Sequence, residues 1–130
     1  SGWPHDKDGV DLTRTVPPVQ NTSHMASMLA LYMGCSPIYL LGMDHDWLAQ
    51  HSLDVHFYPD SDQDPASASA AHWSQYRVLM EMALTVWKIH EILRDFAHRR
   101  GIQIYNATAG GYLDVYPRVE FESLFPTRAG

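Results

Sequence analysis

The side chains best suited to catalysis or metal binding lie in a stretch rich in aspartate and histidine. Asp44, His45 and Asp46 follow the apolar residues 38–41 after Gly42 and Met43. Imidazole and carboxylate groups are common ligands of Zn²⁺, Mn²⁺ and Mg²⁺. These three residues are therefore candidate metal ligands, with Asp44 also a candidate catalytic residue. The spacing contains no HExxH motif, and a polar loop without a ligand has the same composition. Further ligand types follow along the chain: His51, Asp54, His56 and His72.

His72 is the candidate general base. It begins residues 72–100, which carry the strongest helical pattern in the chain. The dipole at a helix N-terminus lowers the pKa of a nearby histidine, and a neutral imidazole is the form that accepts a proton. A solvent-facing histidine in the first turn of a helix explains the same residue without any function.

Asn21, Thr22 and Ser23 are candidate ligand-binding residues because they precede an apolar stripe over residues 25–32. Their hydroxyl groups and the free N–H groups of a helix start can hold a phosphate. Such residues also act simply as helix N-caps, and the spacing does not separate the two interpretations.

The elements that position these residues are two strands and a long helix. Residues 38–41 form an apolar run bounded by Pro37 and Gly42, which predicts a strand buried on both faces of a parallel sheet. Residues 102–106 predict a second strand. Between them, apolar residues recur at helical spacing: Val78, Met82, Val86, Ile89, Leu93 and Phe96.

This order predicts a right-handed βαβ crossover in an α/β fold. Ligands of such sheets bind beyond the carboxyl ends of the strands. Polar residues follow both strands there, namely Asp44 and His45 after the first and Asn106 and Thr108 after the second. We therefore expect His45, Asn106 and Thr108 to be ligand-binding residues.

Length and composition indicate one α/β domain over residues 1–130. Residues 1–20 carry turn signals and predict an extended entry, and residues 44–71 predict a long loop.

With 9 Lys and Arg against 15 Asp and Glu, the net charge of −6 argues against nucleic acid as a partner. No apolar run approaches the ~20 residues of a membrane span. The single cysteine, Cys35, excludes a disulfide within the chain and fits a cytoplasmic location.

Several phrases go beyond generic patterns. They are IYLLGMDH at residues 38–45, HFY at 56–58, IYNATAGGYL at 104–113 and YPRVEFESLF at 116–125. Together they resemble the Rossmann-like family named for the MptE-type 6-hydroxymethylpterin diphosphokinases. That family includes motility-associated glycosylation proteins of bacteria and is similar, more distantly, to the small bacterial sialyltransferases.

The resemblance implies a role for several residues. In the sialyltransferase relatives a Thr-Ser pair before a helix contacts the nucleotide-sugar donor, and Thr22 and Ser23 match it. Asp44 matches an Asp after the first strand, whereas His45 stands where an aromatic residue is expected. His72 falls at about the place of the general base.

The chain resembles only the C-terminal part of the family domain, because the first strand and the turn that receives the nucleotide have no counterpart here. We therefore expect a partial Rossmann-like three-layer unit, a short parallel sheet with flanking helices. A two-stranded sheet leaves edges open, which predicts a homo-oligomer or association with the missing half of the domain.

Three functions follow from this resemblance. The first is a glycosyltransferase-like domain of bacterial surface-glycan or flagellin glycosylation, which uses a nucleotide-activated sugar such as a CMP-linked one and a glycan or small-molecule acceptor. The second is an ATP-dependent pyrophosphokinase that acts on a hydroxymethylpterin and needs a divalent metal held by aspartates. The third is a non-catalytic assembly module. We expect the isolated chain to be inactive even where its parent is a transferase.

Overall fold

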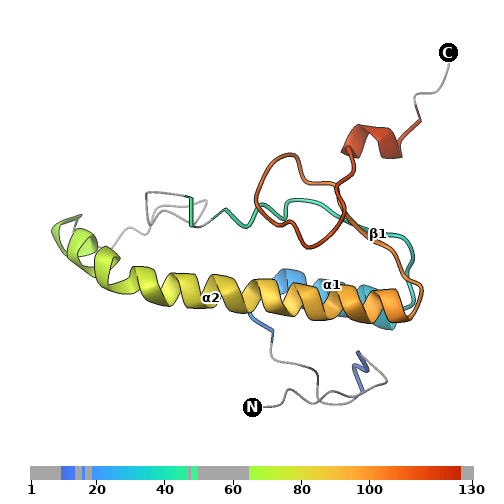
Figure 1. Ribbon diagram of the computed structural model, residues 1–130, viewed down its shortest axis with the longest axis horizontal. Coiled ribbons are helices and arrows are strands. Elements are labelled where there is room, and N and C mark those ends of the chain that lie inside the picture. The colour runs from blue at the N-terminus through green and yellow to red at the C-terminus, as the bar shows by residue number, and fades with distance from the viewer. Residues whose placement is uncertain (1–9, 14–15, 17–18, 47, 50–64, 127–130) are drawn as a thin grey trace.

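The computed structural model shows a mixed α/β protein. It describes residues 10–13, 16, 19–46, 48–49 and 65–126, with residues 65–75 described by their backbone only. The elements in chain order are α1 (Thr22–Tyr32), β1 (Ile38–Leu40), α2 (Pro65–Arg99), β2 (Ile104–Asn106) and the short 3₁₀ helix η1 (Phe121–Leu124). Figure 1 shows α1 and α2 lying side by side below the two strands.

The two predicted strands pair in parallel, which confirms the predicted short parallel sheet. Ile38 lies opposite Ile104, and Leu40 lies opposite Asn106. A single parallel bridge between Asn106 and Arg118 extends the pairing on the outer side of β2. The carboxyl ends of both strands therefore meet at one edge, which positions the segments that follow them.

The helices cover one face of this sheet. Ile38, Leu40 and Ile104 belong to the same core as residues of α1 and α2. The prediction that residues 38–41 are buried on both faces is wrong, because Tyr39 is 45% exposed and Leu41 is 60% exposed. The described residues form two layers, so the three-layer Rossmann-like arrangement stays a prediction.

The long helix begins earlier than predicted. α2 starts at Pro65 rather than at residue 72, so residues 65–71 do not belong to the predicted loop over 44–71. Proline is favoured in the first turn of a helix, where its missing N–H is not needed, and the alanines that follow are strong helix formers. Residues 50–64 of that predicted loop lie outside the described residues, as does most of the predicted entry over residues 1–20.

Only the C-terminal part of the predicted apolar stripe of α2 is buried. Val86, Ile89 and Leu93 lie in the core, as does Phe96. Val78 and Met82, in contrast, are each 52% exposed. Figure 1 shows that the N-terminal part of α2 extends past the strands. The prediction of a buried face along the whole helix is wrong at these two positions.

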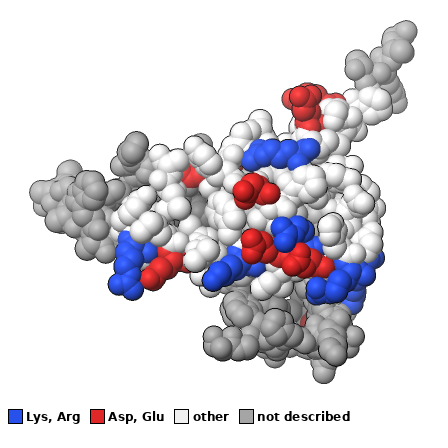
Figure 2. All heavy atoms as spheres, viewed as in Figure 1, with Lys and Arg blue, Asp and Glu red and all other residues white. Residues whose placement is uncertain are grey.

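The charged surface shows no dominant basic patch on the face in Figure 2, where Lys and Arg alternate with Asp and Glu. Among the described residues, no helix combines the length and the apolar character that a membrane span requires.

Candidate functional site

A pocket of about 630 Å³ lies at the edge where β1 and β2 end. We call it the strand-end pocket. Its lining comes from the residue after β1, the segment after β2 and the region around η1: Leu41, Ala107, Thr108, Ala109, Gly110, Arg118, Val119, Glu120, Phe121 and Glu122. This is the position in which parallel α/β sheets bind ligands. Of the predicted ligand-binding residues, Thr108 lines it directly.

Hydrogen bonds join the segments that follow the two strands. The Met43 N–H donates to Thr108 Oγ1 at 2.9 Å, and the Tyr112 N–H donates to the carbonyl oxygen of Asp44 at 2.7 Å. Asn106 is fully buried, and its Nδ2 donates to the Leu113 carbonyl at 3.1 Å. The predicted residues Asn106 and Thr108 therefore hold the pocket edge together.

Gly111 permits this close approach. Its φ is +74°, and a Cβ atom placed on it would lie 2.5 Å from the carbonyl oxygen of Asp44. Such a contact requires the backbone to move, so the two segments can meet in this way only with glycine at this position.

Arg118 is a structural residue of the pocket that the sequence-based predictions did not include. Its guanidinium donates to the carbonyl oxygens of Thr108 at 3.1 Å, Gly111 at 2.9 Å and Leu113 at 3.4 Å, and also to that of Gly110. These bonds fix the turn that follows β2. The phrase YPRVEFESLF contains Arg118, so the resemblance was the one signal that pointed to it.

Three buried histidines lie together where α1 and α2 meet the segment after β1. His24 belongs to α1, His45 to that segment and His90 to α2, and we call them the histidine cluster. The ring centroids of His24 and His90 are 4.4 Å apart, and the Nε2 atoms of His45 and His90 are 3.0 Å apart. Because each histidine comes from a different element, the cluster joins α1 and α2 to the segment that carries Asp44.

We assign the ring proton of His90 from the hydrogen bonds around it. The hydroxyl of Tyr116 donates to the backbone carbonyl of His90 at 3.2 Å, which uses its only hydrogen. His90 Nδ1, 3.0 Å from the same oxygen, must then be the donor in that contact. His90 Nε2 is left as an acceptor, and His45 Nε2–H donates to it. In this arrangement the His90 imidazole is neutral, because its Nε2 accepts a hydrogen bond.

His24 completes the cluster with one atom unsatisfied. Its Nδ1 accepts from the Gln20 N–H at 3.3 Å, which leaves the hydrogen on Nε2. That Nε2 is buried and has no hydrogen-bond partner. The backbone of Val86 raises the pKa of the ring, but desolvation has the larger effect.

Burial lowers the pKa of every histidine in the cluster. Desolvation lowers the pKa of His24 to about 4. Desolvation and then the charges of the other two histidines lower the pKa of His90 to about 3. The pKa of His45 is also lowered by burial, and the carboxylates of Asp44 and Asp46 oppose this effect. All three imidazoles are therefore neutral near pH 7.

His45 also has an unusual backbone. Its φ of +50° lies in the left-handed region, and its side chain is buried. Such conformations are rare for residues other than glycine and occur often at functional sites. In the part of the chain that the structure describes, no group of three His, Cys, Asp or Glu residues is placed to hold a metal ion. Asp44, His45 and Asp46 thus do not converge there, and His51, Asp54 and His56 lie outside the described residues.

The predicted phosphate-binding residues at the start of α1 form an N-cap. Asn21 Oδ1 accepts from the His24 N–H at 3.0 Å and from the Ser23 hydroxyl at 2.7 Å. Thr22 is exposed and begins the helix. Capping accounts for the hydrogen bonds seen here, and phosphate binding stays a prediction.

The backbone places His72 inside α2, seven residues after its start at Pro65. The interpretation of His72 as a first-turn histidine is therefore wrong, and the helix dipole no longer supports a lowered pKa there. Eighteen residues of helix, or about 27 Å, separate it from His90, the residue that contacts His45. The side chain of His72 lies outside the described residues, so its role as a base stays a prediction.

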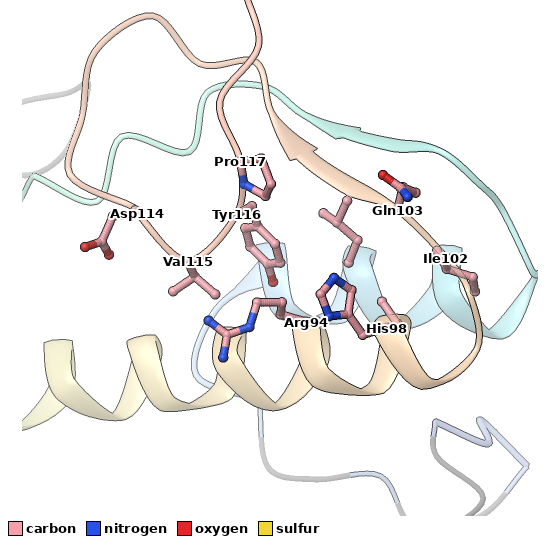
Figure 3. A pocket seen from close by; sticks show the side chains of 10 residues that line it. Arg94, His98, Ile102, Gln103, Asp114, Val115, Tyr116 and Pro117 are labelled. Carbon is pink, nitrogen blue, oxygen red and sulfur yellow. The ribbon is translucent and has the colours of Figure 1, made fainter.

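A second pocket, of about 320 Å³, lies at the other end of β2. We call it the helix-end pocket. Figure 3 shows Tyr116 pointing from the loop toward α2, the helix that carries Arg94. The two charged side chains of this pocket among the described residues are already engaged, since Arg94 pairs with Asp95 and Asp114 accepts from the Trp87 indole N–H. The strand-end pocket is therefore the stronger candidate site.

Comparisons with protein families, with curated proteins and with solved structures find no match to this chain.

Proposed function

We propose that this chain is the part of a glycosyltransferase-like domain that binds a nucleotide-activated sugar at the strand-end pocket. One observation carries the proposal: a pocket of ligand size lies beyond the carboxyl ends of two parallel strands. The resemblance to glycosylation proteins, similar to the small sialyltransferases, supports it and implies a bacterial surface glycan or flagellin as the acceptor and the cytoplasm as the location.

Thr108 is the residue best placed to touch the ligand. Its Oγ1 accepts from the Met43 N–H, which leaves the hydroxyl hydrogen to donate into the pocket. Asn106 supports Thr108 by accepting from its N–H at 3.0 Å. In this proposal Thr22 and Ser23 hold the donor phosphate, and His72 removes the proton of the acceptor hydroxyl.

Ligand-induced thermal stabilisation tests the proposal. The chain is unfolded by heat with CMP, CDP, UDP, ATP or GTP, each with and without Mg²⁺, Mn²⁺ or Zn²⁺. A ligand at one hundred times its Kd adds about 2.7 kcal/mol, which raises the Tm of a domain of this size by several degrees. We expect a shift with a cytidine or uridine nucleotide. A shift confined to ATP with Mg²⁺ would favour the pyrophosphokinase, and no shift at all would contradict nucleotide binding by this chain.

Variants of Thr108 test whether the stabilising ligand binds at the strand-end pocket. Thr108→Val removes the donor and should abolish the ligand-induced shift, while Thr108→Ser should restore it. Thr85→Val is the matched control, because the Thr85 hydroxyl donates to the Glu81 carbonyl on α2 and does not line the pocket. Comparing shifts with and without ligand separates binding from the loss of the Met43 hydrogen bond.

A further inference from the structure

Two apolar stripes run along the N-terminal part of α2, which extends past the strands (Figure 1). Val78 and Met82 continue the buried face of the helix. Tyr76, Met80 and Leu84 follow one another at intervals of four residues, so they share one side of the helix, and we call them the outer stripe. These three residues are 42%, 43% and 56% exposed. A helix that is apolar on more than one side is normally covered by a partner.

The outer stripe faces away from the core of its own chain. Leu84 is 56% exposed, although its neighbours Ala83 and Val86 are only 4% and 5% exposed. Another molecule can therefore cover the outer stripe without disturbing the packing of α2 against the described core.

The charges of α2 indicate the kind of partner. Over residues 65–87, Arg77 and Glu81 are the only Lys, Arg, Asp or Glu residues. They pair with one another at 3.1 Å, so this stretch offers no excess charge to a charged partner. Helices that lie on membrane surfaces carry several Lys and Arg residues along their polar side. A single arginine, in a chain with a net charge of −6, does not provide such a side.

The pattern is instead complementary to itself. In an antiparallel pair of α2 helices with a two-fold axis at Met80, Tyr76 of one copy lies level with Leu84 of the other. Arg77 then lies on the same side of the pair as Glu81 of the second copy, about 3 Å away along the helix axis. We propose that the outer stripe binds the outer stripe of a second copy of this chain in this antiparallel arrangement. This inference concerns assembly and does not depend on the proposed function.

Sedimentation equilibrium of the 130-residue chain tests the proposal. A single helix pair lies at the small end of interface sizes, so we expect a dimer with a Kd on the order of 10 μM. Leu84→Glu places a charge within the outer stripe and should weaken the dimer at least about tenfold. Val78→Glu is the matched control, because Val78 is exposed to a similar degree on the other stripe, and it should leave the Kd unchanged.

Charge reversal tests the antiparallel register. Arg77→Glu and Glu81→Arg each place like charges opposite one another in a homodimer, and each should raise the Kd severalfold. An equimolar mixture of the two variants should form a heterodimer with about the affinity of the unmodified chain, because opposite charges then face each other again. Native mass spectrometry identifies this heterodimer by its mass. A folding defect in either variant cannot produce such a recovery.

A chain that stays monomeric at about 100 μM would overturn the proposal. A dimer that Leu84→Glu leaves intact, or that Val78→Glu weakens as strongly, would show that another surface forms the interface. A mixture of the two charge variants that associates no better than either variant alone would rule out the antiparallel register.

Discussion

Acidification should destabilise this protein through the histidine cluster. Burial lowers the pKa of His24 to about 4 and that of His90 to about 3, from an ordinary value of 6.5. Below pH 6.5 the histidines of the unfolded chain bind protons that the folded chain excludes. The stability contributed by neutral, buried His24 is therefore complete above pH 6.5 and is lost as the pH falls toward 4.

The magnitude follows from the lowered pKa. One pKa unit corresponds to about 1.4 kcal/mol, so the change from 6.5 to about 4 at His24 is worth roughly 3 kcal/mol once the pH is below 4. About 2 kcal/mol of this is lost by pH 5. His90 adds to the loss over a window that extends to about pH 3, although the two rings share part of the effect because they lie in contact. This loss is large compared with the usual free energy of unfolding of a protein domain, roughly 5–15 kcal/mol.

Urea unfolding at pH 7.5 and pH 5.0 measures the effect. The free energy of unfolding should fall by at least about 2 kcal/mol between these values in the unmodified chain. In His24→Leu the free energy of unfolding should fall by clearly less over the same pH range, because this variant lacks one of the histidines whose protonation the folded state excludes. His98→Gln is the control, since His98 is exposed on the last turn of α2. Parallel pH dependences in the unmodified chain and in His24→Leu would refute the reasoning.

Two further substitutions test the packing around the site. Gly111→Ala should cost about 1–3 kcal/mol, since it combines a positive φ with a Cβ contact to the Asp44 backbone, whereas Gly110→Ala, with a similar φ and open space around its Cβ, should cost less. Chemical denaturation of the pair checks this, and equal losses would contradict the close-approach argument. Tyr116→Phe should cost about 1–3 kcal/mol, because it leaves the buried His90 Nδ1–H without an acceptor. Hydrogen exchange should then show faster opening of α2 near His90, and unchanged exchange would contradict the assigned tautomer.

The strand pair and its polar edge were predictable from the sequence. Two apolar runs separated by a helical pattern force a parallel pairing, and this alone brought Thr108 and Asp44 to the same edge. Their place in the candidate site was also predictable, because parallel sheets bind ligands beyond the carboxyl ends of their strands, where these polar residues lie.

The histidine cluster was less accessible to sequence reasoning. His90 follows Val86 by four residues and precedes Leu93 by three, so it lies on the buried stripe of α2, and this spacing was the available signal. His24 carried the same kind of signal, because it precedes the buried residues Met28 by four positions and Leu31 by seven on α1. The meeting of these histidines in one cluster depends on contacts between elements distant in sequence, which local periodicity does not encode.

The start of α2 was mispredicted for a different reason. Pro65 and the serines after it are common in loops, but proline in a first turn and alanine within a helix both favour the helical state. The exposed positions Val78 and Met82 show the converse, since a perfect apolar period does not guarantee that a second surface is present to bury it.

Chemical-shift mapping of the isotopically labelled chain tests the central claim most directly, namely that the strand-end pocket is the ligand site. The backbone amide signals are followed during titration with a UDP-linked neutral sugar and a CMP-linked sugar. We predict that the largest changes occur at Thr108, Gly110 and Phe121, with small changes at Arg94 and Gln103 of the helix-end pocket. Changes centred on the helix-end pocket, or none with either nucleotide sugar, would contradict the claim.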